Sequence, residues 1–221
     1  MLENIERSRA RYGPFRGVLG INIGKNFDTP NENAVADYLT CFKKASPVAD
    51  YIAINLSSPN TAGLRDLQNM ETCRSLVEEL QAERDHRVAS RTGKRTPLVV
   101  KIAPDLSNEH IDDLAGVFNT TRIDGVIATN TTISREAVAG HPLADEKGGL
   151  SGAPVTQRST EVIRRLRSAL DPDIPIIGVG GINSAQDAAD KLDAGAALVQ
   201  VYTGLIYLCG KSPDDGSLAG S

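Results

Sequence analysis

Polar side chains crowd residues 55–64, NLSSPNTAGL, directly after the apolar run YIAI. Two asparagines, two serines and a threonine are more than a turn of the chain requires. Asn55 and Asn60 each offer a donor and an acceptor, which suits the edge of a planar amide or imide ligand. Ser58 can act as a base if a proton passes to a short relay of hydroxyl groups or water, whereas the absence of G-x-S-x-G argues against a hydrolase nucleophile. A capped turn accounts for one of the two serines without any chemistry.

Two further candidate residues lie at the ends of other apolar runs. Lys101 lies in LVVKIAPD, where an ammonium group buried without a partner is unfavourable. An ion pair or a Schiff-base lysine would fit this position, and a lysine that faces an anionic ligand or a reduced cofactor ring fits it better. Asn130 ends the run GVIATN and offers another amide to a planar ligand.

Two glycine-rich turns are candidates for binding phosphate. GVGG at 178–181 precedes Ser184 at a predicted helix start, so its free backbone N–H groups lie near a positive helix end. GGLSG at 148–152 is either a mobile flap or a second phosphate contact. The alternative for GVGG is close packing of a strand on a helix, and the dinucleotide pattern G-x-G-x-x-G is not completed.

Six short apolar runs, β-branched in part and without strict alternation, predict parallel strands that are buried on both faces. They are VLGINI (18–23), YIAINL (51–56), LVVKI (98–102), GVIATN (125–130), IPIIGVGG (174–181) and ALVQVY (197–202). Apolar positions at three- and four-residue spacing predict helices over 32–45 and 69–85. The order is therefore β-α, repeated.

Capping residues mark two more helices. Ser107 predicts the start of a helix over 108–118. Ser184 and Asp187 form an S-x-x-D capping pattern, and Gly195 suits the end of the helix that follows.

Repeated β-α units permit an open doubly wound sheet or a (β/α)8 barrel. A doubly wound sheet concentrates its site at one switch point, whereas a barrel gathers residues from many strand ends. Chemically active residues end nearly every predicted strand: Asn22 and Lys25, Asn55 and Ser58, Lys101, Thr129 and Asn130, Gly180 and Gly181, Tyr202 and Thr203. This distribution favours a single-domain barrel, although six strands are too few to close one.

Composition and charge exclude several classes of function. The net charge of −4, the pI near 5.4 and the absence of tryptophan argue against a nucleic-acid partner. Three cysteines and three histidines show no ligand spacing, so we expect no metal, and the odd number of cysteines indicates reduced thiols in a cytosolic protein. No apolar run reaches the ~20 residues that cross a bilayer, and the charged start MLENIERSRARY is not a signal peptide.

Seven motifs, in order, closely resemble the class 2 dihydroorotate dehydrogenases, the quinone-linked flavoenzymes of pyrimidine biosynthesis. The motifs are GINIGKN, NLSSPNTAGLR, VKIAPDL, DGVIATNTT, GGLSG, IPIIGVGGI and LVQVYTG, between Gly17 and Tyr207. The resemblance implies an FMN-containing (β/α)8 TIM barrel that oxidises dihydroorotate to orotate, with a quinone as electron acceptor. It also implies a family location peripheral to the inner membrane, on the cytoplasmic side.

The resemblance implies a role for each candidate residue. Ser58 resembles the catalytic base that removes the C5 proton, and a cysteine at that position would mark class 1 instead. The implied orotate contacts are Asn55, Asn60, Asn130 and Thr131. The implied flavin contacts are Asn22, Asn55, Lys101 and Thr129, with Gly152, Gly181, Tyr202 and Thr203 around the phosphate and ribityl groups.

The family pattern extends beyond this sequence at both ends. Two strands with a flavin-binding motif, a membrane-associating segment and a final helix find no counterpart here. We therefore expect a partial TIM barrel over 1–207, with about six of eight parallel strands, and a disordered or aberrant tail over 208–221. Open sheet edges favour association, and we expect weak FMN binding, little turnover and a cytoplasmic chain.

Two other functions stay open at this point. One is another FMN barrel that acts on a dihydropyrimidine or a dihydrouridine, although the acidic pI argues against a tRNA substrate. The other is a truncated, catalytically impaired remnant that acts at most as a ligand-binding or interaction module.

Overall fold

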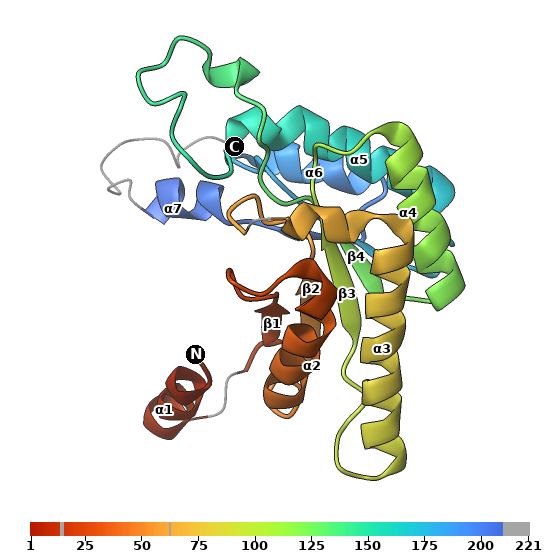
Figure 1. The fold of residues 1–221 in the computed structure, drawn as a ribbon. Helices are drawn as coiled ribbons and strands as arrows, with labels where there is room; N and C mark the ends of the chain where they lie inside the picture. Colours follow the sequence, from red (N-terminus) through yellow and green to blue (C-terminus); the bar gives the residue numbers. More distant parts are fainter. Residues whose placement is uncertain (14–15, 62, 210–221) are drawn as a thin grey trace.

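The computed structural model describes residues 1–13, 16–61 and 63–209 and contains one parallel sheet. Its strands are β1 (Gly20–Ile23), β2 (Tyr51–Asn55), β3 (Leu98–Ile102), β4 (Gly125–Ala128), β5 (Ile176–Val179) and β6 (Leu198–Gln200). They pair in sequence order, β1-β2-β3-β4-β5-β6, and every pair is parallel. Parallel strands in sequence order with helical crossovers form half of a barrel, which confirms the predicted partial TIM barrel (Figure 1).

The helices that connect successive strands pack against the outer face of this sheet (Figure 1). In chain order the helices are α1 (Leu2–Tyr12), α2 (Ala34–Ala45), α3 (Met70–Ala89), α4 (Asn108–Thr121), α5 (Thr156–Ala169), α6 (Ala185–Asp193) and α7 (Thr203–Cys209). Neighbouring helices α2, α3, α4 and α5 contact one another in turn. Their apolar faces and the outward side chains of the strands form one large hydrophobic core behind the sheet.

The predicted elements agree with the observed ones in type and order. The predicted helix over 69–85 extends to Ala89, and the predicted helix over 32–45 begins with a short 3-10 turn, Asn31–Asn33. Both predicted caps are confirmed, because Ser107 accepts the backbone N–H of His110 and Ser184 accepts that of Asp187.

The strands are shorter than the apolar runs that predict them. The run 125–130 forms a strand only over Gly125–Ala128, and the run 174–181 only over Ile176–Val179. Thr129 and Asn130 therefore lie in the loop beyond β4, and Gly180 and Gly181 lie in the loop beyond β5. Loop residues at this end are free to face a ligand.

The inner face of the sheet carries a small apolar cluster and then a polar layer. Ala53, Val99, Ile127 and Val179 form the cluster. One register row above Ala53 and Val99, Asn55 pairs with Lys101 across β2 and β3. Alternation along each strand thus directs these two polar side chains to the same inner face, at the carboxyl ends of their strands.

A buried arginine fastens the amino ends of the strands. Arg84 on α3 donates to Asp124 Oδ2 at 2.8 Å, immediately before β4. The same carboxylate accepts the backbone N–H of Leu98 at 2.9 Å and the guanidinium of Arg95 at 2.7 Å. This amino-end clamp, Arg84 with Asp124, ties α3 to β3 and β4.

None of the helices within the described ranges is both long and apolar enough to cross a bilayer. Helix α7 ends at Cys209. Most of the predicted tail, residues 210–221, lies outside the described residues.

Candidate active site

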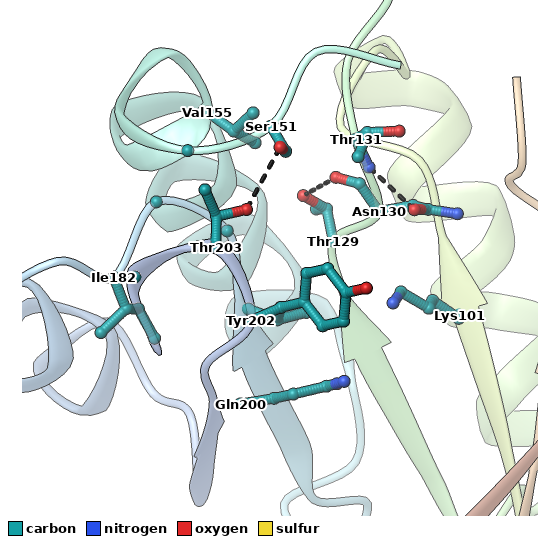
Figure 2. A pocket seen from close by; sticks show the side chains of 15 residues that line it. Lys101, Thr129, Asn130, Thr131, Ser151, Val155, Ile182, Gln200, Tyr202 and Thr203 are labelled. Carbon is teal, nitrogen blue, oxygen red and sulfur yellow. Dashed lines mark hydrogen bonds between the residues drawn. The ribbon is translucent and has the colours of Figure 1, made fainter. Parts of the chain in front are cut away.

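A cavity of about 250 Å³ opens at the carboxyl ends of β3, β4, β5 and β6 (Figure 2). The side chains around it include Lys101, Thr129, Asn130, Thr131, Ser151, Val155, Val179, Ile182, Gln200, Tyr202 and Thr203, and its backbone walls include Gly152, Gly180, Gly181 and Gly204. Eight of the candidate residues from the sequence therefore meet in one place. The volume is near the lower limit for small-molecule sites, which suits part of a mononucleotide.

Lys101 supplies the positive charge of the cavity. Its side chain reaches the cavity from β3, opposite Tyr202 in Figure 2. Among the described residues, its ammonium group has no hydrogen-bond or ion-pair partner. Burial lowers the pKa of Lys101, because desolvation disfavours the charged form. An anion or an electron-rich ring in the cavity would offset that desolvation.

The far wall of the cavity comes from β6 and α7. Gln200 and Tyr202 both point into the cavity, and Thr203 donates its hydroxyl to Ser151 at 3.1 Å (Figure 2). That bond joins the loop before α5 to the start of α7. Tyr202 is 72% exposed, so this side of the cavity is open to solvent.

The glycine-rich turns at the cavity allow close approach of the backbone. Gly181 has φ +69°, and a Cβ atom there would lie 2.0 Å from Thr156 Oγ1. Gly152 has φ +81° and also lies on the cavity wall. Any other residue at Gly181 would be strained and would clash with the first residue of α5. An unpaired ammonium, several hydroxyls and glycine backbone on the cavity wall fit a phosphorylated planar ring such as a flavin nucleotide.

A hydrogen-bonded network joins the loop beyond β2 to the loop beyond β4. Asn130 Nδ2 donates to Ser57 Oγ at 3.1 Å and to Asn55 Oδ1 at 3.3 Å. Asn55 Oδ1 also accepts the Ser57 hydroxyl at 3.0 Å and the Ser57 N–H at 3.2 Å. With three donors on its oxygen, the Asn55 amide is fixed, and its Nδ2 remains available as a donor. Asn130 Oδ1 accepts the N–H of Thr131.

Ser58 and Asn60 lie beside the cavity and do not line it. Ser58 is half-buried, and its hydroxyl accepts the N–H of Asn60 at 3.2 Å, which closes a turn. Asn60 is exposed, and its Oδ1 lies 3.2 Å from the position that a Cβ atom on Gly148 would take. The Ser58 hydroxyl thus caps a turn, as the capped-turn alternative predicts for one of the two serines, and Ser57 is fully buried in the network above.

Asn22 is not brought to the cavity. It lies on β1 at the edge of the sheet and is exposed on the inner face, opposite Ala53 in register. One strand, β2, lies between Asn22 on β1 and Lys101 on β3, and Asn22 is not among the residues that line the cavity. Its implied flavin contact therefore stays a prediction.

The segment 133–150 crosses over the loop beyond β2, and one side chain organises it. Arg135 donates to six main-chain carbonyls, those of Thr132, Ile133, Ser134, Ala144, Glu146 and Gly148. At the far end of the segment, a Cβ atom on Gly149 would lie 1.8 Å from Thr131 Oγ1 and 2.9 Å from Pro59 Cγ. The segment therefore packs directly against the loops that carry Ser58 and Asn130.

Gln200 and Ser57 are cavity or network residues that the sequence did not single out. Gln200 has a usable signal, because it is the one polar residue in the apolar run ALVQVY and faces the same side as Tyr202. Ser57 has no such signal, since its neighbour Ser58 is equally polar. In the part of the chain that the structure describes, no cluster of three or more His, Cys, Asp or Glu side chains could hold a metal ion.

The family model described as dihydroorotate dehydrogenase matches residues 1–215. A dihydroorotate dehydrogenase (quinone) from Stenotrophomonas maltophilia (strain K279a) is 58% identical over 207 residues, which are 94% of this chain and 58% of that protein. A protein of the same name from Flavobacterium lutescens is 59% identical over 192 residues, or 87% of this chain and 55% of the relative.

Solved structures give the same relationship. The crystal structure of DHODH from Eimeria tenella in complex with ferulenol superposes with a TM-score of 0.83 at 40% identity, over 94% of this chain and 58% of that one. The ligand-free form from the same organism gives a TM-score of 0.81 at 41% identity, over 94% and 60%. The chain thus spans less than two thirds of the length of these relatives.

Proposed function

The chain belongs to the dihydroorotate dehydrogenase family, and on that premise we propose that its cavity serves the FMN-dependent oxidation of dihydroorotate to orotate, a step of pyrimidine biosynthesis. The observation that carries this proposal is the convergence of Lys101, Thr129 and Asn130 on one cavity whose other walls are the glycine turns at Gly152 and Gly181. A cation and amides on one side and backbone N–H groups on the other match the two ends of a flavin nucleotide.

The family is generally flavin-dependent, and we assign FMN to the cavity. Lys101 and Thr129 would contact the ring, and Gly152, Gly181, Tyr202 and Thr203 would hold the ribityl and phosphate groups. Asn22 would join the ring contacts from β1. When bound, FMN would supply the acceptor for the hydride that leaves C6 of dihydroorotate. Lys101 would hold its ammonium group beside the ring and stabilise the negative charge of the reduced cofactor.

The loops beyond β2 and β4 would bind the substrate. Asn55 offers its free Nδ2 to a carbonyl oxygen, because its own oxygen is occupied by Ser57 and Asn130. Asn60, Asn130 and Thr131 would complete the contacts with the amide edges and the carboxylate. Ser58 would accept the C5 proton on its hydroxyl oxygen while its own hydroxyl proton passes to water. The side chain would therefore stay neutral.

A quinone is the proposed electron acceptor, because the relatives carry quinone in their names. A quinone dissolves in the hydrocarbon of a bilayer, so the complete enzyme would meet it at a membrane surface. By the family resemblance, we assign that surface to the cytoplasmic side of the inner membrane.

Anaerobic titration of the purified 221-residue chain with FMN tests the proposal. For this partial barrel we expect weak but saturable binding of FMN, and then slow loss of its visible absorbance when dihydroorotate is added. Dihydrouracil is the matched control substrate, since it has the same ring without the carboxylate. We expect orotate, and not uracil, to compete.

Two results would overturn the proposal. An FMN complex that dihydroorotate leaves oxidised would remove the assigned reaction. Bleaching by dihydrouracil as fast as by dihydroorotate would assign the site to another dihydropyrimidine.

A further inference from the structure

One guanidinium group joins three loops at the carboxyl end of the sheet. Arg65 lies in a short 3-10 helix, Leu64–Gln68, just after the loop beyond β2. Its Nε donates to the carbonyl of Ser57 at 3.3 Å, and one terminal nitrogen donates to the carbonyl of Thr131 at 3.0 Å. The other terminal nitrogen donates to Asp105 Oδ2 at 2.8 Å, beyond β3.

Asp105 extends the same connection to the segment after β4. Its carboxylate accepts the hydroxyl of Thr132 and, at 3.2 Å, the backbone N–H of Ile133. The side chains of Arg65 and Asp105 are only 21% and 19% exposed, so water screens their attraction incompletely. We call these two residues the carboxyl-end clamp.

The clamp acts at peptide groups adjacent to proposed site residues. The carbonyl of Ser57 belongs to the peptide bond that leads into Ser58, and Thr131 directly follows Asn130. Neither Arg65 nor Asp105 is among the residues that line the cavity. The clamp can therefore affect the chemistry only through the positions of the two loops.

We propose that Arg65 and Asp105 are positioning residues that hold the loop of Ser58 at a fixed distance from the loop of Asn130. The substrate role of this clamp depends on the proposed function. A planar guanidinium satisfies acceptors in three directions at once, whereas a lysine at this position would reach one of them. Displacing a catalytic group by about 1 Å reduces rates by roughly 10²-fold, so a clamp at this place matters for turnover.

The experiment compares Arg65→Gln, Arg65→Lys and Asp105→Asn with the matched control Arg84→Gln in the full chain. Arg84 belongs to the amino-end clamp, an arginine–aspartate pair of the same 2.8 Å length at the other end of the sheet. The control therefore loses this pair and the second ion pair of Arg84, with the exposed Asp85, and does not touch the loops.

The first measurement is hydrogen exchange of the backbone amides of residues 57, 58, 60 and 132–134, without any ligand. We expect exchange in Arg65→Gln to be faster by about tenfold, which corresponds to the loss of one or two charge-assisted hydrogen bonds. Arg84→Gln should leave these amides unchanged. If these amides exchanged in Arg65→Gln at the same rate as in wild type, the proposed clamp would be refuted.

The second measurement is flavin bleaching as a function of dihydroorotate concentration. We expect the limiting rate in Arg65→Gln to fall about 100-fold, with the FMN dissociation constant within about twofold of wild type. Arg65→Lys should not restore the rate. The double variant with Arg65→Gln and Asp105→Asn should bleach only slightly more slowly than Arg65→Gln alone. An unchanged rate in Arg65→Gln would overturn the positioning role.

The two measurements separate the inference from the proposed function. A wild-type FMN complex that dihydroorotate does not bleach refutes the proposed function alone. In that case the exchange measurement still decides whether Arg65 holds the two loops together.

Discussion

The two ends of the sheet are fastened by the same pair of residue types, with different surroundings. At the amino end, Arg84 and Asp124 are 6% and 14% exposed, and the same carboxylate also holds Arg95 and the Leu98 amide. At the carboxyl end, Arg65 and Asp105 are more exposed and join loops instead of regular elements. The amino end thus fixes the scaffold, and the carboxyl end fixes the geometry of loops on that scaffold.

The two ends of the sheet also differ in whether their buried charges have partners. At the carboxyl end, Lys101 remains without a partner among the described residues, and desolvation lowers its pKa. Keeping such a group near a cavity lowers stability, which proteins tolerate where a ligand uses the charge. The comparison predicts that substitutions at the carboxyl end reduce chemistry and spare stability, whereas those at the amino end do the reverse.

Ser58→Ala should give the largest effect on chemistry. Removing the proposed proton acceptor should slow bleaching of bound FMN by dihydroorotate by about 10²–10⁴-fold. The affinity for FMN should not change, because Ser58 does not line the cavity. Stopped-flow absorbance measures the rate, and Ser90→Ala, in an exposed turn at the amino end, is the control. Near-normal bleaching in Ser58→Ala would remove the assigned base.

Lys101→Met should slow bleaching by about 10²–10³-fold, because the charge that builds on the ring loses its cation. Stability should hold or rise, since methionine fills the same space without a desolvated charge. Thermal unfolding without FMN measures this part. A less stable variant that bleaches at the normal rate would make Lys101 a structural residue and erase the contrast between the two ends.

Arg84→Leu should lower the free energy of unfolding by about 2–3 kcal/mol. This is less than for an isolated buried pair, because Asp124 keeps Arg95 and the Leu98 amide as partners. Urea denaturation monitored by circular dichroism measures the change. Flavin binding by the remaining folded protein should be normal, and weaker binding would contradict the separation of the two ends.

Lys191 should give the smallest effect, through pH. This fully buried lysine donates to Thr160 and to the carbonyl of Thr156, and desolvation lowers its pKa to about 8, against the opposing charges of Asp187 and Asp190. Between pH 8 and the ordinary value of 10.5, the unfolded chain binds more protons than the folded chain, so folding stability rises with pH. Relative to Lys191→Met, wild type should gain about 1–2 kcal/mol across this range. If urea denaturation gave the same difference in unfolding free energy between the two proteins at every pH, this prediction would be contradicted.

The sequence predicts the strands well because buried parallel strands need runs of branched apolar residues, and few other elements do. It does not locate α5, whose sequence TQRSTEVIRRLRSA has few apolar positions. The first helical residue, Thr156, follows Val155, which provides no capping side chain. Polar helices that cover a sheet with a narrow apolar stripe give a weak periodic signal.

The sequence predicts which strand-end residues lie near the candidate site, but not which loop side chains line it. Parallel strands bring their carboxyl ends to one edge, so Lys101, Thr129 and Tyr202 were expected to meet, and they do. Which side chain of a loop lines the cavity depends on turn geometry, and neither Ser57 nor Ser58 lines it. Arg65 was unpredictable for the same reason, because its three acceptors come from loops far apart in sequence.

Arg135 makes the path of the segment 133–150 insensitive to the identity of most of its side chains. All six of its acceptors are main-chain oxygens, which every amino acid possesses. The residues between Glu136 and Lys147 can therefore drift in identity while the path of the chain is kept, provided that its length is unchanged. We therefore expect substitutions in this part of the chain to be tolerated better than the insertion or deletion of a residue.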